Sequence, residues 1–143
     1  MSNKETGDAG EIEVRDLVPC PNCGSKLALL PPSFPLADIL CTRCQFRAQV
    51  KTVSKKPSDS ILGAGYDIYD KVFRAGYLLP PLFANFKWTD KNGDRKQEIR
   101  FYPLISKKNV QSYTLSEKAV RANYKMFRYI GLKTAPFIVV FER

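Results

Sequence analysis

The chain has 143 residues, a formal net charge of +9, and contents of 44% hydrophobic and 12% aromatic residues. This length suits one hydrophobic core, and the apolar and aromatic content excludes a disordered or low-complexity chain. No apolar run approaches the roughly 18 residues of a membrane-spanning helix, and the polar opening lacks the apolar stretch of a signal peptide, so we expect a cytoplasmic protein without a membrane partner.

Charge is distributed unevenly along the chain. Residues 1–16 hold two basic and five acidic side chains, so the rest of the chain carries a net charge of +12. A positive surplus of this size favours polyanions, of which nucleic acid is the first candidate. Ordinary solubility charge is the alternative, and charge alone names no function.

The N-terminal segment predicts no regular structure. Residues 1–10 contain Gly7 and Gly10 and show no apolar periodicity, which is typical of a mobile terminus. We therefore expect residues 1–15 to form a flexible acidic N-terminus. Residues 16–143 are expected to form a single domain that contains the cysteines.

Four cysteines form the most specific motif. Two C-x-x-C knuckles are separated by seventeen residues, and their members are Cys20, Cys23, Cys41 and Cys44. Each knuckle directs two sulfurs at one point, with the spacing of a four-thiolate zinc site. The chain has no histidine, and four thiolates leave no position for substrate, which predicts a structural zinc ion in a reducing compartment. A redox cysteine pair and an iron site are the alternatives.

The remaining pattern predicts strands interrupted by two helices. The expected elements are strands at 27–30, 36–40 and 46–53, a helix from Ser60 capped by Gly76, a hairpin of strands 82–88 and 97–105 around the turn 90–94, a helix at 114–129 and a buried strand at 136–141. Aromatic residues of these elements, Trp88 among them, are expected in the core. This order predicts an α/β (α+β) fold, in which a zinc ribbon is inserted into a mixed sheet flanked by helices.

Three polar residues interrupt the predicted sheet. Asp38 is an acid in an otherwise apolar strand, where burial without a partner is unfavourable. Gln49 and Lys51 follow on the next strand and share one side of it. An acid beside such a pair is the constellation of PD-(D/E)xK nucleases, in which the acids hold magnesium at the scissile phosphate and the lysine orients water. A strand-end Asp38 that caps the knuckle by accepting backbone N–H bonds is the alternative.

The helix expected at 114–129 carries a basic stripe. Its four cations, spaced three, four and three residues apart, are Lys118, Arg121, Lys125 and Arg128. An adjoining apolar stripe would pack this helix on the sheet and leave the cations free to bind DNA phosphates. Lys55 and Lys56, which follow the strand of Lys51, favour DNA over the alternative of a solvated helix face.

From Cys20 onward, the chain resembles the catalytic domain of DpnI-like, methyl-directed restriction endonucleases. The residues that carry this resemblance are Cys20-Pro21-Asn22-Cys23-Gly24, Pro35-Leu36-Ala37-Asp38, Cys41-Thr42-Arg43-Cys44 and Gln49-Val50-Lys51, and more loosely Gly65-Tyr66, Tyr102-Pro103-Leu104 and Tyr129-Ile130-Gly131. The resemblance implies a PD-(D/E)xK fold with a nested four-cysteine zinc ribbon. It also implies magnesium-dependent cleavage of double-stranded DNA.

The resemblance assigns roles to individual residues. It implies that Asp38 and Lys51 are catalytic, with Gln49 in the place of the family's second acid. Asp38 and Gln49 would then be the magnesium ligands. Tyr129 lies in the segment that approaches DNA, where the family has a tryptophan.

Two functions from different classes follow. The first is a metal-dependent DNA endonuclease of restriction or defence type. The second is a catalytically degenerate, zinc-containing DNA-binding module, in which Gln49 marks the loss of the acid. A zinc-ribbon accessory protein of transcription or translation is a third alternative. The family has a helix before the first knuckle, and only Glu11 and Glu13 could supply its acid here. A homodimer, or a partner chain that carries the family's DNA-reader domain, is an open expectation for the assembly.

Overall fold

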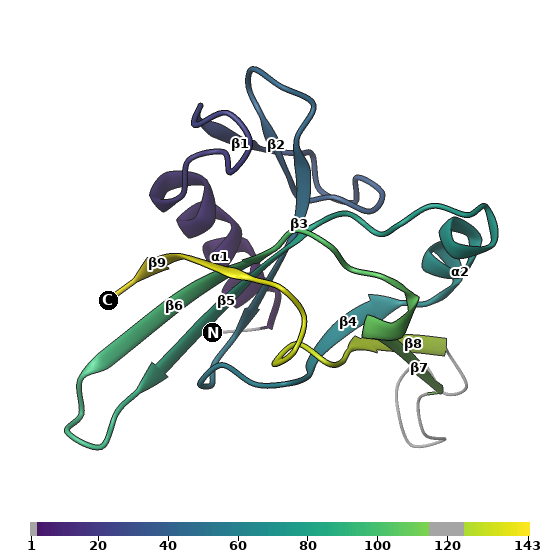
Figure 1. The fold of residues 1–143 in the computed structure, drawn as a ribbon. Coiled ribbons are helices and arrows are strands. Elements are labelled where there is room, and N and C mark those ends of the chain that lie inside the picture. Colours follow the sequence, from purple (N-terminus) through teal and green to yellow (C-terminus); the bar gives the residue numbers. More distant parts are fainter. Residues whose placement is uncertain (1–2, 115–124) are drawn as a thin grey trace.

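The fold is of the α+β class, with a six-stranded mixed sheet, a three-stranded sheet and two α-helices in the part that the structure describes (Figure 1). The structure is a computed structural model that describes residues 3–114 and 125–143. Its elements in chain order are α1 (Asn3–Leu17), β1 (Leu27–Leu29), β2 (Ile39–Cys41), β3 (Arg47–Val53), β4 (Ile61–Gly65), α2 (Asp67–Arg74), β5 (Leu82–Thr89), β6 (Arg95–Tyr102), a 3-10 turn (Lys107–Asn109), β7 (Val110–Thr114), β8 (Lys125–Tyr129) and β9 (Ile138–Glu142). Among these described residues, no helix has both the length and the apolar character needed to cross a membrane.

The larger sheet has the strand order β1-β2-β3-β5-β6-β9. β3 and β5 pair in parallel, whereas the other neighbours in this sheet are antiparallel. β4 and α2 lie between β3 and β5 in the chain and provide the crossover that parallel strands require. β5 and β6 form the predicted hairpin, whose turn includes Gly93 with φ of +82°, a conformation that favours glycine.

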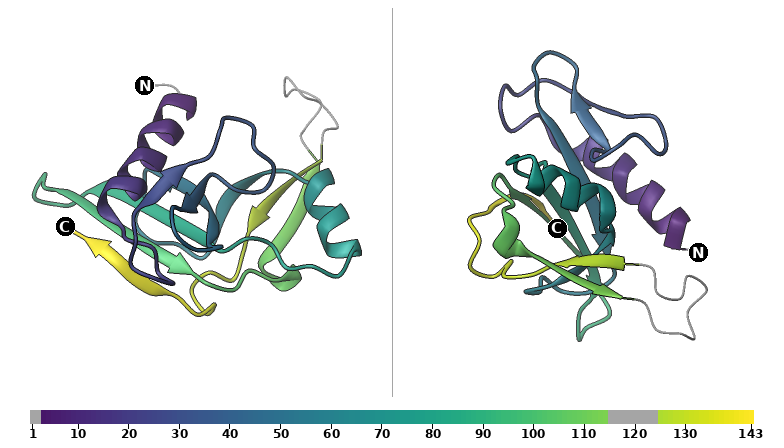
Figure 2. Two further views of the ribbon diagram at one scale, coloured as in Figure 1. Left: turned by 90° about the horizontal axis from the view of Figure 1, so that it is seen from above. Right: turned by 90° about the vertical axis from the view of Figure 1, so that its right-hand side faces the viewer.

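β3 separates two hydrophobic clusters, because successive side chains of a strand point to opposite faces. On one face, Ala48 and Val50 pack with Val14 of α1, which lies across this side of the sheet (Figure 2). On the other face, Phe86 of β5 belongs to a cluster that includes Tyr129 of β8. The small sheet β4-β8-β7 and α2 therefore cover the side opposite to α1.

Helix α1 occupies the segment that was expected to be flexible. The prediction of a structureless N-terminus is therefore wrong for residues 3–15. Val14 is fully buried, and Gly10 lies so close to β3 that a Cβ atom at this position would fall 1.7 Å from Thr52 Oγ1. Apolar periodicity is weak in this helix because one of its contacts with the sheet is made by a glycine.

The helix predicted at 114–129 is wrong where the structure describes it. Residues 125–129 form β8, which pairs with β7, and residues 115–124 lie outside the described part of the chain. Phe127 and Tyr129 are buried, and this alternation has the period of a strand. Over so few residues, apolar spacing does not separate a helix from a strand.

Two further elements differ from the sequence-based expectation. The helix expected from Ser60 is a strand, β4, followed by the shorter helix α2, although Gly76 has φ of +83° close to the helix end as predicted. The last strand is present as β9, but its predicted burial is wrong: Ile138 is 58% exposed and Val139 is 41% exposed. β9 is an edge strand that pairs with β6 alone, so much of it stays in contact with solvent.

Candidate functional site

The four cysteines converge on one point, as predicted. Their Sγ atoms all lie within 4.8 Å of one another. The closest Sγ–Sγ distances are 3.6 Å between Cys20 and Cys44 and 3.4 Å between Cys23 and Cys41. In each knuckle, the backbone N–H two residues after the first cysteine donates to its sulfur, at 3.4 and 3.3 Å. This arrangement can hold one metal ion, and within the described residues no other group of three or more thiol or carboxyl side chains converges in this way.

The four cysteines differ in how deeply they are buried. Burial raises the pKa of the Cys20 thiol to about 11. Hydrogen bonds with Ser25 lower the pKa of Cys23 to about 6, and a hydrogen bond from the Asn22 side chain lowers the pKa of Cys44. The outer thiols are therefore supplied with hydrogen-bond donors that favour thiolate, the form that binds a metal.

Asp38 lies where β2 leaves the edge of β3. β2 pairs with β3 at Arg47 and Ala48, so the rest of β3 is open on this side. The Asp38 N–H donates to Ala48 O at 2.9 Å, and the Asp38 Oδ2 accepts a hydrogen bond from Val50 N at 2.8 Å. Asp38 thus has the N–H-capping contact that was the alternative interpretation of this residue. Burial raises its pKa above the ordinary value, and the charge of Lys51 opposes this rise.

Lys51 and Glu11 reach the same open edge from two elements. The Lys51 Nζ donates to the carbonyl oxygen of Gly63 in β4 at 3.3 Å. Burial lowers the pKa of Lys51, while the negative charges of Asp38 and Glu11 oppose this effect. Burial raises the pKa of Glu11 from 4.5 to about 7, the charges of Asp38 and Asp8 add to the rise, and Lys51 opposes it. Asp38, Glu11 and Lys51 therefore form one electrostatic cluster, which we call the edge cluster.

Glu11 is the residue of this cluster that sequence reasoning named only as one of two acids that could belong to a first helix. Of the two acids considered for a first helix, Glu11 lines a hollow together with Asp38. Glu13 instead accepts hydrogen bonds from Lys87 at 2.7 Å and from Gln97 at 3.1 Å, over β5 and β6. The available signal was the resemblance, because the family has a helix before the first knuckle whose acid only Glu11 or Glu13 could supply.

Gln49 is held between two tyrosines. It is 7% exposed; its Oε1 accepts a hydrogen bond from the Tyr129 hydroxyl at 2.7 Å, and its Nε2 donates to the Tyr69 oxygen at 2.6 Å. Burial raises the pKa of Tyr69 to about 12 and raises that of Tyr129 well above its ordinary value, and the Asp38 charge contributes to both shifts. The amide therefore joins β3 to β8 and α2.

The predicted role of Tyr129 at the DNA surface is not compatible with its position. Its side chain is 1% exposed and packs edge-to-face on Phe127, with ring centroids 5.1 Å apart. It cannot contact DNA without unfolding of this region. Its hydroxyl is instead part of the support of Gln49.

A hollow of about 500 Å³ opens onto the edge cluster. Its lining combines three acids with an apolar wall, and the residues are Asp8, Glu11, Ile12, Leu29, Leu30, Pro31, Pro32, Ser33 and Asp38. Carboxylate oxygens are the ligands that Mg²⁺ prefers. Glu11 and Asp38, which both line this hollow, are therefore the donors that could receive this ion, whereas the Gln49 amide is buried between its two tyrosines and does not line it.

The cations predicted to bind DNA do not form one stripe. Lys118 and Arg121 lie outside the described residues. Lys125 and Arg128 are three positions apart on β8, so their side chains point to opposite faces of the strand. Lys125 Nζ lies 4.7 Å from the centroid of the Tyr66 ring, and Arg128 Cζ lies 4.8 Å from the centroid of the Tyr113 ring. Lys55 and Lys56 are exposed beyond the end of β3, where Lys55 Nζ donates to Ser60 O at 3.1 Å.

Comparison with known proteins does not assign this chain to a family. No protein-family model matches the chain, and no curated protein matches its sequence.

Proposed function

We propose that this protein is a magnesium-dependent DNA endonuclease of the PD-(D/E)xK type with a structural zinc ion. The observation that carries the proposal is the position of Asp38 at the open edge of β3, where its carboxylate accepts a hydrogen bond from Val50 N at 2.8 Å, next to Lys51, and lines a hollow together with Glu11. The sequence motif requires that an acid from one strand and a lysine from the next lie close together in space. A Lys51 directed to bulk solvent would have argued against it.

Zinc in the cysteine cluster would stabilise the segment that carries Asp38. Four thiolates satisfy the tetrahedral preference of zinc and leave no position for a substrate. Asp38 precedes β2, and its carbonyl oxygen accepts a hydrogen bond from Leu30 N at 2.9 Å, next to β1. Because β1 and β2 connect the two knuckles, a metal that fixes the knuckles also fixes the backbone of Asp38.

The protein side chains divide the catalytic tasks. Bound magnesium would supply positive charge to the scissile phosphate and would lower the pKa of a coordinated water. Asp38 and Glu11 would hold the ion through carboxylate oxygens, and the Gln49 Oε1 has a second lone pair beside the one that accepts from Tyr129. Lys51 carries the positive charge that positions the attacking water and stabilises the charge that develops on the phosphate.

The resemblance to DpnI-like endonucleases supports the same proposal. That family has a helix before the first knuckle, and α1 occupies this place with Glu11 facing the edge cluster. The basic surplus of the chain and the exposed Lys55 and Lys56 support DNA as the substrate.

A DNA-binding module without catalysis is the second candidate. The observation that favours it is the Gln49 amide, which already has a hydrogen-bond partner at both its oxygen and its nitrogen. In this case the edge cluster is a remnant of a nuclease site, and DNA is bound but not cut.

A nicking and cleavage assay on plasmid DNA separates the two candidates. Wild type, Lys51→Ala and the control Lys26→Ala, which removes an exposed lysine beside the knuckles, are incubated with adenine-methylated and unmethylated plasmid and with Mg²⁺ or Mn²⁺. We expect metal-dependent cleavage by wild type and Lys26→Ala and none by Lys51→Ala. Circular dichroism and zinc content check that all three are folded. DNA binding without cleavage under either metal would refute the nuclease and favour the module.

A further inference from the structure

The end of the β5–β6 hairpin combines the single tryptophan of the chain with several cations. Trp88 of β5 is paired with Lys96 of β6, so the two side chains lie on one face of the hairpin. Lys56, which follows β3, and Lys91, in the hairpin turn, line the same hollow of about 490 Å³ beside Trp88. Three lysines from three separate segments thus surround one indole, and we call these four residues the Trp88 surface.

The lysines of the Trp88 surface are not neutralised within the described chain. Lys56, Lys91 and Lys96 are exposed, and no described carboxylate lies within 4.0 Å of their ammonium groups. Asp90 also lines the hollow, but its Oδ1 accepts hydrogen bonds from the backbone of the turn, from Asn92 N and Asp94 N, both at 2.9 Å. The surface therefore has an excess of positive charge next to an aromatic ring.

Trp88 is held in place while part of its ring stays accessible. It packs against the core cluster that contains Phe86, and it also lines two hollows, of about 490 Å³ and about 370 Å³. A ring fixed in this way binds a planar partner with little loss of side-chain entropy. The sequence-based expectation of a core aromatic describes one side of Trp88, and the two hollows describe the other.

We propose that the Trp88 surface binds single-stranded DNA, with the three lysines on backbone phosphates and the indole stacked on an unpaired base. The charge complementarity selects a polyanion, and the ring selects one that exposes flat aromatic faces. A duplex offers the same phosphates but keeps its bases stacked inside, so it would engage the lysines and leave the indole unused. This inference shares only the substrate class with the proposed nuclease, because it does not involve the edge cluster.

The test uses Trp88 as its own reporter. Zinc-loaded protein carrying Lys51→Ala, in buffer without added Mg²⁺ or Mn²⁺, is titrated with oligothymidylate and with a duplex of equal length while tryptophan fluorescence is recorded. We expect quenching by the single strand, a much smaller change with the duplex, and a fall in affinity with salt. Binding of the single strand without any change in fluorescence would overturn the inference, because the indole would then lie outside the contact.

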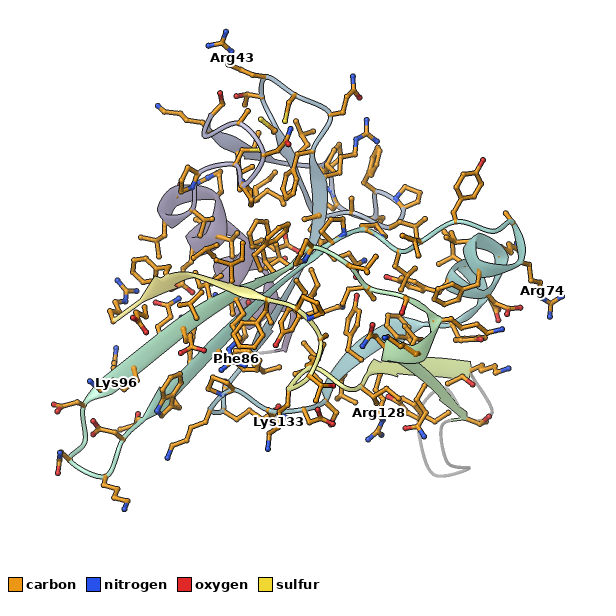
Figure 3. All side chains as sticks on the ribbon, viewed as in Figure 1. Arg43, Arg74, Phe86, Lys96, Arg128 and Lys133 are labelled. Atoms are coloured by element: carbon orange, nitrogen blue, oxygen red, sulfur yellow. The ribbon has the colours of Figure 1, made fainter. Side chains whose placement is uncertain are left out.

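Substitution of the lysines tests the phosphate contacts without removing the reporter. Each phosphate contact contributes about 0.7 to the slope of log K against log salt for a single strand, so the triple variant Lys56→Gln, Lys91→Gln and Lys96→Gln should reduce this slope by about 2 and weaken binding by roughly tenfold or more at physiological salt. Lys96→Gln alone is compared with Arg43→Gln, which removes the same charge at the opposite end of the molecule (Figure 3). Equal losses from these two would mean that net charge, and not this surface, determines binding.

The outcomes distinguish this inference from the proposed function. Quenching that the triple variant abolishes, in a protein that never cuts DNA, would keep the Trp88 surface and refute the nuclease. Metal-dependent cleavage by a wild-type protein whose Trp88 fluorescence does not change when DNA is added would support the nuclease and refute binding at the Trp88 surface.

Discussion

Gly10→Ala is expected to destabilise the protein, whereas Gly7→Ala, in the same helix, is not. A Cβ at position 10 would lie 1.7 Å from Thr52 Oγ1 and 2.7 Å from Thr52 Cβ. A Cβ at position 7 would meet nothing within 4 Å. The two substitutions are chemically identical, so their difference measures the contact between α1 and β3.

The magnitudes follow from two opposing effects. Alanine in place of glycine in a helix interior favours folding by up to about 1 kcal/mol, which Gly7→Ala should show in full. At position 10 the same gain is opposed by overpacking, which typically costs about 1–3 kcal/mol. We therefore expect Gly10→Ala to have a free energy of unfolding about 1–3 kcal/mol below that of Gly7→Ala.

Urea unfolding followed by circular dichroism measures this difference. A second readout connects it to the edge cluster, because Glu11 follows Gly10 and moves with α1. The stabilisation of the protein by Mg²⁺ or Mn²⁺ should fall in Gly10→Ala and remain in Gly7→Ala. Equal stability and equal metal response of the two variants would refute the docking of α1 on β3 described here.

Three other changes test the site. Tyr129→Phe leaves the buried Gln49 Oε1 without its donor and should lower the free energy of unfolding, measured in urea, by about 1–3 kcal/mol. The control Tyr77→Phe, at a residue that is 71% exposed, should leave the free energy of unfolding unchanged. Equal effects of the two substitutions would contradict the buried hydrogen bond. The pKa of Glu11 is raised from 4.5 to about 7 in the folded protein, so the stability linked to its proton is fully present below 4.5 and is lost as the pH rises through about 7. Glu11→Gln should therefore be more stable than wild type at about pH 8 but not at about pH 4.5, and unfolding curves that show no gain at the higher pH would exclude this shift. Chelation of the metal, or Cys23→Ser, should release zinc and make the segment around β1 and β2 sensitive to protease, as measured by metal analysis and limited proteolysis; a metal-free protein with the protease resistance of wild type would contradict a structural ion.

Local patterns predicted the parts of the fold that depend on neighbouring residues. The cysteine cluster follows from two short knuckles, each of which forms its own turn. The β5–β6 hairpin follows from alternating strands around a turn with Gly93. Both features are determined within a short stretch of chain, where spacing and turn chemistry are sufficient.

The elements that were predicted incorrectly depend on distant partners. α1 is stabilised by the contact of Gly10 with Thr52 of β3. The sequence of α1 has no apolar periodicity that would indicate this packing. β8 is a strand because it pairs with β4 on one side and β7 on the other, both remote in the chain. In each case tertiary pairing overrides local propensity.

The same distinction applies to the candidate site. Asp38 and Lys51 were selected because they were predicted on successive strands, and in the structure Asp38 precedes β2 and accepts a hydrogen bond from Val50 N, next to Lys51 in β3. Glu11 and the two tyrosines around Gln49 come from α1, α2 and β8. Their presence could not be predicted without the docking of those elements.

The charge balance of the edge cluster gives a physical reason for an amide at position 49. Two carboxylates already share this desolvated place, and their mutual repulsion contributes to the raised pKa of Glu11. A carboxylate at position 49 would add a third negative charge near Asp38, between two hydroxyl groups whose own pKa values the Asp38 charge already raises. The amide of Gln49 keeps an oxygen in this position without the charge, and its Nε2 gives the Tyr69 oxygen a donor that a carboxylate lacks. With one lysine to offset two acids, the ionised cluster already has an excess of one negative charge before a cation binds, and a glutamate at position 49 would add another. A gain of metal affinity in Gln49→Glu would therefore be accompanied by a loss of stability in the protein without magnesium.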